Sequence, residues 1–205
     1  MKLYLAPTAC SFTSHIVLRE LGLPFELESV NFGTKKTRSG EDFKAINPKG
    51  KVPALKLDDG QVLTEGSVIV QYLADQKPEA GLLPKAGTFE RIRVQEWLNF
   101  IATEVHKGFS PLFKPNTPDE TKKAYKDLIA QAWDFVSKKL GDKPFLTGND
   151  FSVADAYLFN MLQWNKTKGG EELDLAKWPV LQAFEARVAT RPAVRAAVEA
   201  EAALR

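Results

Sequence analysis

The stretch Val52-Pro53-Ala54-Leu55-Lys56-Leu57-Asp58-Asp59-Gly60-Gln61-Val62-Leu63-Thr64-Glu65-Gly66 decides the fold prediction. Two apolar runs, at residues 52–57 and 61–63, flank an Asp-Gly pair, and this arrangement predicts a tight β-hairpin. The apolar periodicity of residues 66–75 predicts a helix directly after the hairpin. Pro53 stands at the front of the first strand, where it cannot donate a ladder hydrogen bond. The segment therefore predicts a ββα unit with an unusual strand entry.

Upstream of this unit, the pattern alternates between strands and helices. A strand at residues 2–5 precedes a helix at about 11–21 that ends at Gly22, and a strand at 25–30 precedes a short helix near 41–46. The resulting order, βαβαββα, predicts an α/β unit with a mixed sheet and helices on its faces. This order is typical of thioredoxin-like folds.

Downstream, residues 78–87 lose the periodicity and are rich in proline, glycine and charge, which is typical of an interdomain linker. Beyond the linker, apolar residues recur at three-to-four spacing and predict only helices. These helices are expected at residues 90–109, 118–140, 152–164, 179–189 and 192–204. We therefore expect a thioredoxin-like domain at residues 1–77 and an all-helical domain at 88–205.

The composition excludes several classes of protein. The 205 residues are 44% hydrophobic and 26% charged, as in ordinary globular domains, and a formal charge of +2 gives no basic field for nucleic acid. A single cysteine excludes internal disulfides and a Cys-rich zinc site, and it fits a reducing compartment. No apolar run could span a bilayer, and the apolar start is too short for an export signal. We therefore expect a cytoplasmic protein with no nucleic acid, membrane or metal partner.

Cys10 is the first candidate for chemistry. It lies between the first strand and the first helix, where unpaired helix N–H groups favour a thiolate. The alternative is a small buried core residue, the commonest fate of a free cysteine. Lowering a thiol pKa by ~2 units raises the thiolate fraction at pH 7 roughly 25-fold, but the loss of nucleophilicity leaves a gain of only a few-fold. Positioning of the reactants must therefore supply most of the catalysis.

Two further segments suggest a peptide-like ligand. A cis bond before Pro53 would leave the backbone of Val52 for an extended peptide, whereas an ordinary trans proline is the alternative. Glu65 offers a carboxylate to an amine, and the helix start at Gly66 offers N–H groups to an anion. The alternative is that Thr64 and Glu65 merely cap the helix. Together, Glu65 and Gly66 match the zwitterionic end of an amino acid.

The helix predicted at residues 90–109 has a polar stripe at helical spacing. Its members are Asn99, Thr103, His106 and Lys107. An imidazole can donate a hydrogen bond to a thiolate, so His106 is a candidate site residue, and an ordinary solvated face is the alternative. His15, in the first helix, is expected to be structural. Ser152 followed three residues later by Asp155 predicts a helix-capping arrangement with a role in folding.

In combination, these segments resemble the glutathione transferase family, most closely its bacterial beta class, over essentially the whole chain. The resemblance rests on Cys10-Ser11, Asn47-Pro48, and residues 52–55, 64–66 and 99–107. It implies a homodimer that conjugates glutathione to a hydrophobic electrophile, with no cofactor beyond the co-substrate glutathione. The alternatives are a glutathione-dependent thiol–disulfide or peroxide reductase that uses Cys10, and a non-catalytic ligand-binding protein.

The resemblance also implies roles for individual residues. Val52 and a cis Pro53 would hold the cysteinyl part of glutathione, and Glu65 with Gly66 would hold the γ-glutamyl end. Lys35 would meet the glycyl carboxylate, although a solvated loop lysine is the alternative. Further residues are implied at the sulfur, at the rest of the glutathione site and at the hydrophobic cleft. They are Cys10 and His106 as catalytic residues, Asn99, Thr103 and Lys107 as glutathione ligands, and Phe109, Phe113 and Trp164 as the cleft wall.

Some positions depart from the family pattern. Thr8 stands where a glycine is usual, which costs backbone freedom before Cys10. Gly66 stands where other classes have serine. Tyr4 and Ser11 have hydroxyls of the kind that other classes use at the sulfur, and of these we expect Tyr4 in a strand and keep Ser11 as a secondary candidate. We expect glutathione itself to be the nucleophile, Asn99 to reach across a dimer, and Cys10 to form a reversible mixed disulfide.

Overall fold

The computed structural model describes residues 1–204 of the chain. Its contacts divide the chain into two compact units, one formed by Met1–Ala80 with the residues from Thr190 onward, and the other by Gly81–Ala189. The expected all-helical domain at residues 88–205 differs from this division at its C-terminal end. The last helix packs within the first unit, because its apolar face contacts the first helix.

The first unit has the expected order of elements, βαβαββα, followed by a short 3-10 turn and the C-terminal helix. Its elements are β1 (Lys2–Leu5), α1 (Phe12–Leu21), β2 (Glu26–Ser29), α2 (Phe43–Ile46), β3 (Ala54–Lys56), β4 (Val62–Thr64), α3 (Gly66–Asp75), η1 (Pro78–Ala80) and α9 (Pro192–Ala202). The sheet order is β2-β1-β3-β4, with β1 parallel to β2 and antiparallel to β3. The prediction of a mixed, thioredoxin-like sheet is confirmed.

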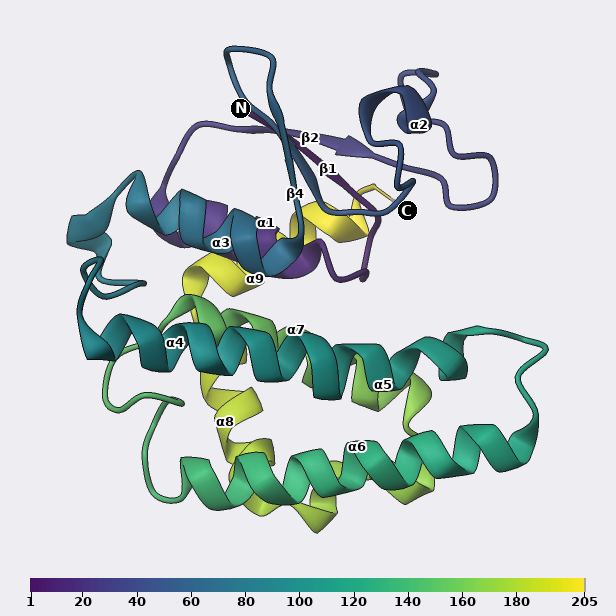
Figure 1. Ribbon diagram of the computed structural model, residues 1–205, viewed down its shortest axis with the longest axis vertical. Helices are drawn as coiled ribbons and strands as arrows, with labels where there is room; N and C mark the ends of the chain where they lie inside the picture. The colour runs from purple at the N-terminus through teal and green to yellow at the C-terminus, as the bar shows by residue number, and fades with distance from the viewer. Residues whose placement is uncertain (205) are drawn as a thin grey trace. The chain divides into compact units, whose positions relative to one another are not determined.

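Helices cover both faces of this sheet (Figure 1). Tyr4 pairs with Ala54 across β1 and β3, and on their face the Tyr4 ring lies 5.8 Å from that of Phe43 in α2. Because side chains alternate along a strand, Leu3 and Leu5 lie on the opposite face. There α1 packs against α3, and α9 packs against α1. Tyr4 is thus a buried strand residue, as expected.

Local sequence signals explain where several elements end. Gly22 adopts a φ of 62° after α1, and its N–H donates to the carbonyl of Arg19, which closes the helix as predicted. Strands β3 and β4 pair as an antiparallel hairpin around the Asp-Gly turn, where Gly60 has a φ of 89°. The predicted hairpin is therefore confirmed.

The second unit contains only helical elements, as the spacing predicts. They are α4 (Phe89–Phe100), the π-helix η2 (Ile101–His106), α5 (Lys107–Phe109), η3 (Ser110–Phe113), α6 (Asp119–Leu140), α7 (Val153–Lys168), η4 (Glu171–Leu173), η5 (Leu175–Lys177) and α8 (Pro179–Ala189). Helix α7 is buried along most of its length and is the centre of this unit. Gly108 allows α5 to approach α6, because a Cβ there would lie 2.9 Å from Cγ1 of Ile129.

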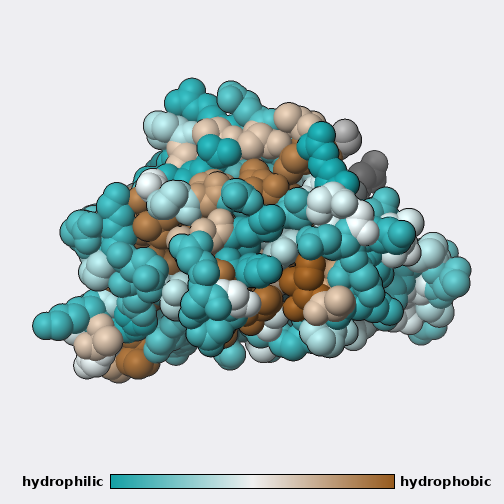
Figure 2. Space-filling model, turned by 90° about the horizontal axis from the view of Figure 1, so that it is seen from above, coloured by the Kyte–Doolittle hydropathy of each residue, from teal (hydrophilic) through white to brown (hydrophobic). Residues whose placement is uncertain are grey.

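In the view of Figure 2, hydrophilic side chains cover most of the surface, and hydrophobic ones show in small areas between them. This distribution fits the balanced composition of the chain. Within residues 1–204, no helix is both long enough and apolar enough to cross a membrane.

Candidate functional site

Cys10 lies in the loop that joins β1 to α1, and its sulfur is held against a neighbouring segment. The thiol donates to the carbonyl oxygen of Val52, with Sγ and O 3.1 Å apart. The side chain is half-buried rather than enclosed in the core, so the core alternative does not describe it. The structure therefore brings together Cys10 and Val52, two of the predicted site residues.

Ser11 stabilises this loop through hydrogen bonds within it. Its hydroxyl accepts from the N–H of Ala6 and donates to the carbonyl of the same residue, at 3.2 Å in each case. The side chain is fully buried. Ser11 is therefore part of the frame of the loop, and the structure does not support it as a secondary partner for a ligand sulfur.

Val52 and Pro53 lie immediately before β3. The bond between them is cis, as expected. Pro53 packs beside the start of α3, because a Cβ placed on Gly66 would be 3.6 Å from Cγ of Pro53. Cys10, Val52, Pro53 and Gly66 thus form a continuous series of neighbours.

Glu65 stands directly before α3 in a backbone conformation that non-glycine residues rarely adopt, with φ 71° and ψ 108°. Its side chain makes no capping hydrogen bond, so the capping alternative fails for this residue. Its Oε1 instead accepts from Nζ of Lys49 at 2.6 Å, and the same Nζ donates to Oγ1 of Thr64. The carboxylate is therefore paired with a lysine ammonium group, and its role towards the amine of a ligand stays a prediction.

Among residues 1–204, three non-glycine residues have a positive φ. They are Thr8 at 63°, Lys35 at 56° and Glu65 at 71°. Such conformations cost on the order of 1–3 kcal/mol each, and they concentrate at functional sites. Lys35 and Glu65 are both predicted glutathione ligands, and Thr8 precedes Cys10 by two residues. The backbone strain of the first unit therefore coincides with the predicted site.

Lys35 is directed over the loop that precedes Val52. Its Nζ donates to the carbonyl of Gly50 at 3.1 Å and lies 5.2 Å from the centre of the Phe32 ring. The alternative of a freely solvated loop lysine therefore does not hold. The ammonium group is fixed at the end of the segment that contains Val52 and Pro53.

In the second unit, His106 is the last residue of the π-helix η2. The wider turns of a π-helix interrupt the regular α-helical spacing from which one shared polar face was predicted for Asn99, Thr103, His106 and Lys107. Single π-helical turns are frequent at functional sites. Asn99, Thr103 and Lys107 are exposed, whereas His106 is half-buried. Thr103 donates from its hydroxyl to the carbonyl of Asn99 at 3.1 Å.

Two aromatic residues of α7 fix the imidazole of His106. Nδ1 is within 2.5 Å of the Tyr157 hydroxyl, and the ring lies edge-on to Trp164 with centroids 4.9 Å apart. Tyr157 is not among the site residues predicted from the sequence. A signal that could have identified Tyr157 is that the hydroxyl of a buried tyrosine needs a polar partner.

The predicted aromatic wall is only partly accessible. Phe113 and Trp164 contact each other edge to face at 4.7 Å, and Phe113 is 43% exposed. Phe109 is fully buried behind Trp164, with ring centroids 6.0 Å apart. This corrects the expected role of Phe109, because a fully buried ring supports the wall and does not form its surface.

Comparisons with known proteins agree with this fold. The family model for the N-terminal domain of glutathione S-transferases matches residues 9–76, and the model for the C-terminal domain matches residues 100–192. The chain belongs to the glutathione S-transferase family.

Within the family, several similar relatives are bacterial proteins. The chain is 46% identical to glutathione S-transferase GstA of Escherichia coli O157:H7, over 98% of each chain. It is also 46% identical, with a TM-score of 0.94, to a sphingomonad glutathione S-transferase complexed with glutathione, over 98% of this chain and 99% of the other. The beta-class enzyme of Sphingomonas chungbukensis gives the same identity and TM-score, over 98% of each chain. These structural neighbours correspond to the bacterial beta class.

Proposed function

We propose that this protein conjugates reduced glutathione to hydrophobic electrophiles. The observation that supports this most directly is the grouping of Cys10, Val52, Pro53 and Gly66 in one series of contacts. Strained backbone at Lys35 and Glu65, and in the loop before Cys10, adds to it. A similar protein has been solved in complex with glutathione. We place the activity in the cytoplasm, because a single cysteine fits a reducing compartment.

Each part of glutathione has a proposed partner in the first unit. The backbone of Val52 pairs with the cysteinyl part of the tripeptide. Glu65 holds the γ-glutamyl amine in place of Lys49, and the N–H groups at the start of α3 hold the neighbouring carboxylate. Lys35 pairs with the glycyl carboxylate. The three charged ends of the ligand therefore meet groups of opposite charge or fitting polarity.

The helical unit supplies the remaining roles in the proposal. His106 donates a hydrogen bond to the glutathione sulfur and so favours the thiolate. Asn99, Thr103 and Lys107 complete the polar part of the glutathione site, and Phe113 and Trp164 contact the apolar electrophile. In the reaction, the thiolate attacks the electrophilic carbon, a carbon–sulfur bond forms, and the leaving group departs with its electron pair. The thiol proton passes to solvent.

A conjugation assay with chlorodinitrobenzene and saturating glutathione tests the proposal. We expect a rate well above that of the protein-free reaction, and a large loss in Glu65→Ala because the amine partner is removed. Conjugation no faster than the uncatalysed rate, across several types of electrophile, would remove the claim of a general transferase. Calorimetry with glutathione then separates a ligand-binding protein from one with no affinity for the tripeptide.

A thiol–disulfide reductase is the second candidate function, because the half-buried thiol of Cys10 contacts the carbonyl proposed to hold the cysteinyl part of glutathione. In this reaction, the Cys10 thiolate attacks the glutathione sulfur of a disulfide between glutathione and a substrate thiol, a mixed disulfide of Cys10 with glutathione forms, and the substrate leaves as its thiolate. A second glutathione thiolate then attacks the mixed disulfide, which releases oxidised glutathione and regenerates Cys10. The two functions use different sulfur atoms and can be separated by substitution.

The active form is proposed to be a homodimer in which Asn99 reaches the partner's site. Exposed apolar side chains on α4 and α6 support this, namely Phe89, Ile92, Leu128 and Phe135. Sedimentation equilibrium is expected to give twice the chain mass of 22.8 kDa. Phe135→Glu is expected to shift the distribution towards monomer, because it places a charge on an apolar surface. A monomeric wild-type protein at micromolar concentration would contradict the assembly.

Tyr157→Phe is expected to lower kcat/KM for conjugation by roughly 5–10-fold, which is the effect of losing one hydrogen bond. The substitution keeps the ring against His106 but removes the hydroxyl that orients Nδ1. Steady-state kinetics with varied glutathione measure the change. Tyr125→Phe, at a half-buried tyrosine on α6, is the matched control and is expected to leave the rate unchanged. Equal rates for wild type and Tyr157→Phe would contradict the role of the hydroxyl.

Gly66→Ser is expected to lower the KM for glutathione by roughly 3–10-fold, since one additional hydrogen bond to a charged ligand is worth ~1 kcal/mol or more. The position has room, because the added Cβ would make only ordinary contact with Pro53 at 3.6 Å. The hydroxyl would stand at the start of α3, beside the proposed γ-glutamyl carboxylate. Gly66→Ala is the control, because it adds the same Cβ without the hydroxyl. An equal gain in both variants would show that the hydroxyl does not bind the ligand.

A further inference from the structure

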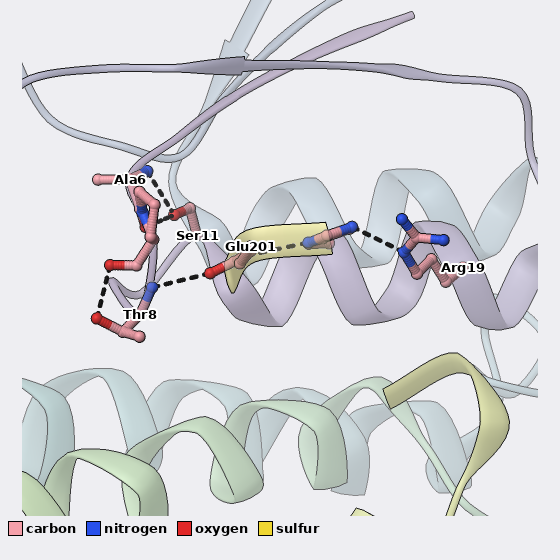
Figure 3. Close-up of polar contacts among 7 residues, drawn as sticks. Ala6, Thr8, Ser11, Arg19 and Glu201 are labelled. Atoms are coloured by element: carbon pink, nitrogen blue, oxygen red, sulfur yellow. Dashed lines mark hydrogen bonds and ion pairs between the residues drawn. The ribbon is translucent and has the colours of Figure 1, made fainter. Parts of the chain in front are cut away.

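A series of polar contacts in the first unit joins the C-terminal helix to the loop before Cys10 (Figure 3). Glu201 of α9 is only 3% exposed although it is a carboxylate. Its Oε2 accepts from the backbone N–H of Thr8 at 2.8 Å, and its Oε1 lies 3.0 Å from Nδ1 of His15 in α1. Arg19 of α1 donates from Nε to the other ring nitrogen of His15 at 2.8 Å. The contact with Thr8 spans 193 positions of sequence.

The direction of each hydrogen bond in this series follows from the arginine. A guanidinium can only donate, so Nε2 of His15 must accept. A histidine that accepts at one ring nitrogen is neutral and carries its proton at the other, so Nδ1 donates to Glu201. The buried carboxylate therefore receives two donors, one from α1 and one from the backbone of Thr8. These donors replace the water that the carboxylate lost on burial.

Thr8 is a residue whose conformation needs such support. Its φ of 63° lies in the left-handed region, which a β-branched side chain rarely adopts. Its hydroxyl donates to the adjacent carbonyl of Pro7 at 2.6 Å. The N–H directed at Glu201 depends on this backbone conformation. Two residues later, the thiol of Cys10 reaches the carbonyl of Val52.

We propose that Glu201 is a positioning residue for the glutathione site. Its carboxylate holds Thr8 in the left-handed conformation and thereby places Cys10 and the loop against Val52, where the cysteinyl part of glutathione is to bind. The role in glutathione binding rests on the proposed function, whereas the control of the Cys10 loop does not. Glu201 touches neither substrate nor sulfur, so its effect passes through Thr8.

The first test is Glu201→Gln, which keeps the size of the side chain but turns an amide NH2 towards one of the two donors. The KM for glutathione is expected to rise roughly tenfold, equivalent to ~1.4 kcal/mol, with kcat within about twofold of the wild-type value. Alkylation of Cys10 by iodoacetamide at fixed pH is expected to become severalfold faster as the loop leaves Val52. Glu199→Gln, at an exposed carboxylate of the same helix, is the matched control and is expected to change none of these values.

A double substitution separates positioning from simple stabilisation. In the T8G background, Glu201→Gln is expected to raise the KM by less than about threefold, because glycine adopts a positive φ without strain. An equal rise in both backgrounds would overturn the proposal. A lower thermal midpoint in Glu201→Gln, with the KM and the alkylation rate at wild-type values, would also overturn the proposal. That pattern is the signature of a purely structural contact.

Two measurements keep the inference falsifiable if Glu201→Gln does not fold or if the protein is not a transferase. In the wild-type protein, hydrogen exchange followed by NMR is expected to show the Thr8 amide protected like the amides within α1. An unprotected Thr8 amide overturns the proposal without any variant. Absence of glutathione binding by calorimetry would reject the proposed function alone, and the alkylation rate of Cys10 in Glu201→Gln would still decide the control of the loop.

Discussion

Cys10→Ala is expected to abolish mixed-disulfide formation with glutathione while lowering the rate of conjugation only a few-fold. The chain has no other cysteine, so no second thiol can replace it. In conjugation the nucleophile is the thiolate of glutathione, and in general a thiol gains only a few-fold in reactivity from a lowered pKa. Mass spectrometry after incubation with oxidised glutathione measures the first effect, and kcat/KM with chlorodinitrobenzene measures the second.

Cys10→Ser is the matched control for this experiment, because its hydroxyl can still donate to the carbonyl of Val52. It is expected to conjugate at the wild-type rate and to form no mixed disulfide. A loss of conjugation of about a hundredfold or more in Cys10→Ala would show that this thiol takes a direct part in the transfer. Full reductase activity in the same variant would show that the redox role of Cys10 is wrong.

Asp155→Ala is expected to lower the free energy of unfolding by about 4 kcal/mol, because it leaves buried donors without their acceptor. Asp155 is fully buried in α7. Its Oδ1 accepts from the N–H of Leu146 at 2.8 Å, and its Oδ2 accepts from the N–H and hydroxyl of Ser152 at 2.9 and 2.6 Å. Together with Ser152 it forms the predicted capping box. Denaturant titration measures the loss, and Asp150→Ala, at an exposed residue just before α7, is the control.

The pH dependence of stability gives a second measurement at Asp155. Burial raises the pKa of this carboxyl to about 6 from its ordinary value of 3.8, and the hydrogen bonds from Leu146 and Ser152 oppose the rise. Between these values the folded state binds more protons than the unfolded state. The stabilisation from this group is therefore fully present below pH 3.8 and is lost as pH rises through about 6. Asp155→Asn is expected to remove this part of the pH dependence, and an unchanged profile would contradict the assignment.

Much of the fold could be predicted from the sequence because the signals are local. The Asp-Gly pair at 59–60 specifies a hairpin, Gly22 ends a helix, and the spacing of Ser152 and Asp155 specifies a cap. Each of these acts through the backbone conformations or hydrogen bonds of residues a few positions apart.

Part of the site could be predicted for the same reason, supported by the resemblance to a family. Cys10 precedes a helix, and Glu65 and Gly66 stand where a strand gives way to one. The structure confirms the cis bond before Pro53 and places Cys10 against Val52. The roles of His106, Asn99, Thr103 and Lys107 towards glutathione stay predictions.

Other features depend on contacts between residues far apart in the sequence. The hydroxyl of Ser11 could have faced a ligand, but it bonds to Ala6 inside the loop. Phe109 has the apolar, aromatic side chain expected in the wall of a hydrophobic cleft, but packing in the second unit buries it completely. The π-helix that ends at His106 breaks the regular period from which its face was predicted.

The sequence by itself determined the order of strands and helices, the turns and caps, and the residue types that a glutathione site needs. Only the tertiary structure decided that α9 packs with α1, that Tyr157 orients His106, and that Glu201 holds Thr8. The physical reason is the range of the interactions. Backbone preferences and helical periods act within a few residues, whereas a buried carboxylate finds its partners only after packing has excluded water and brought distant segments together.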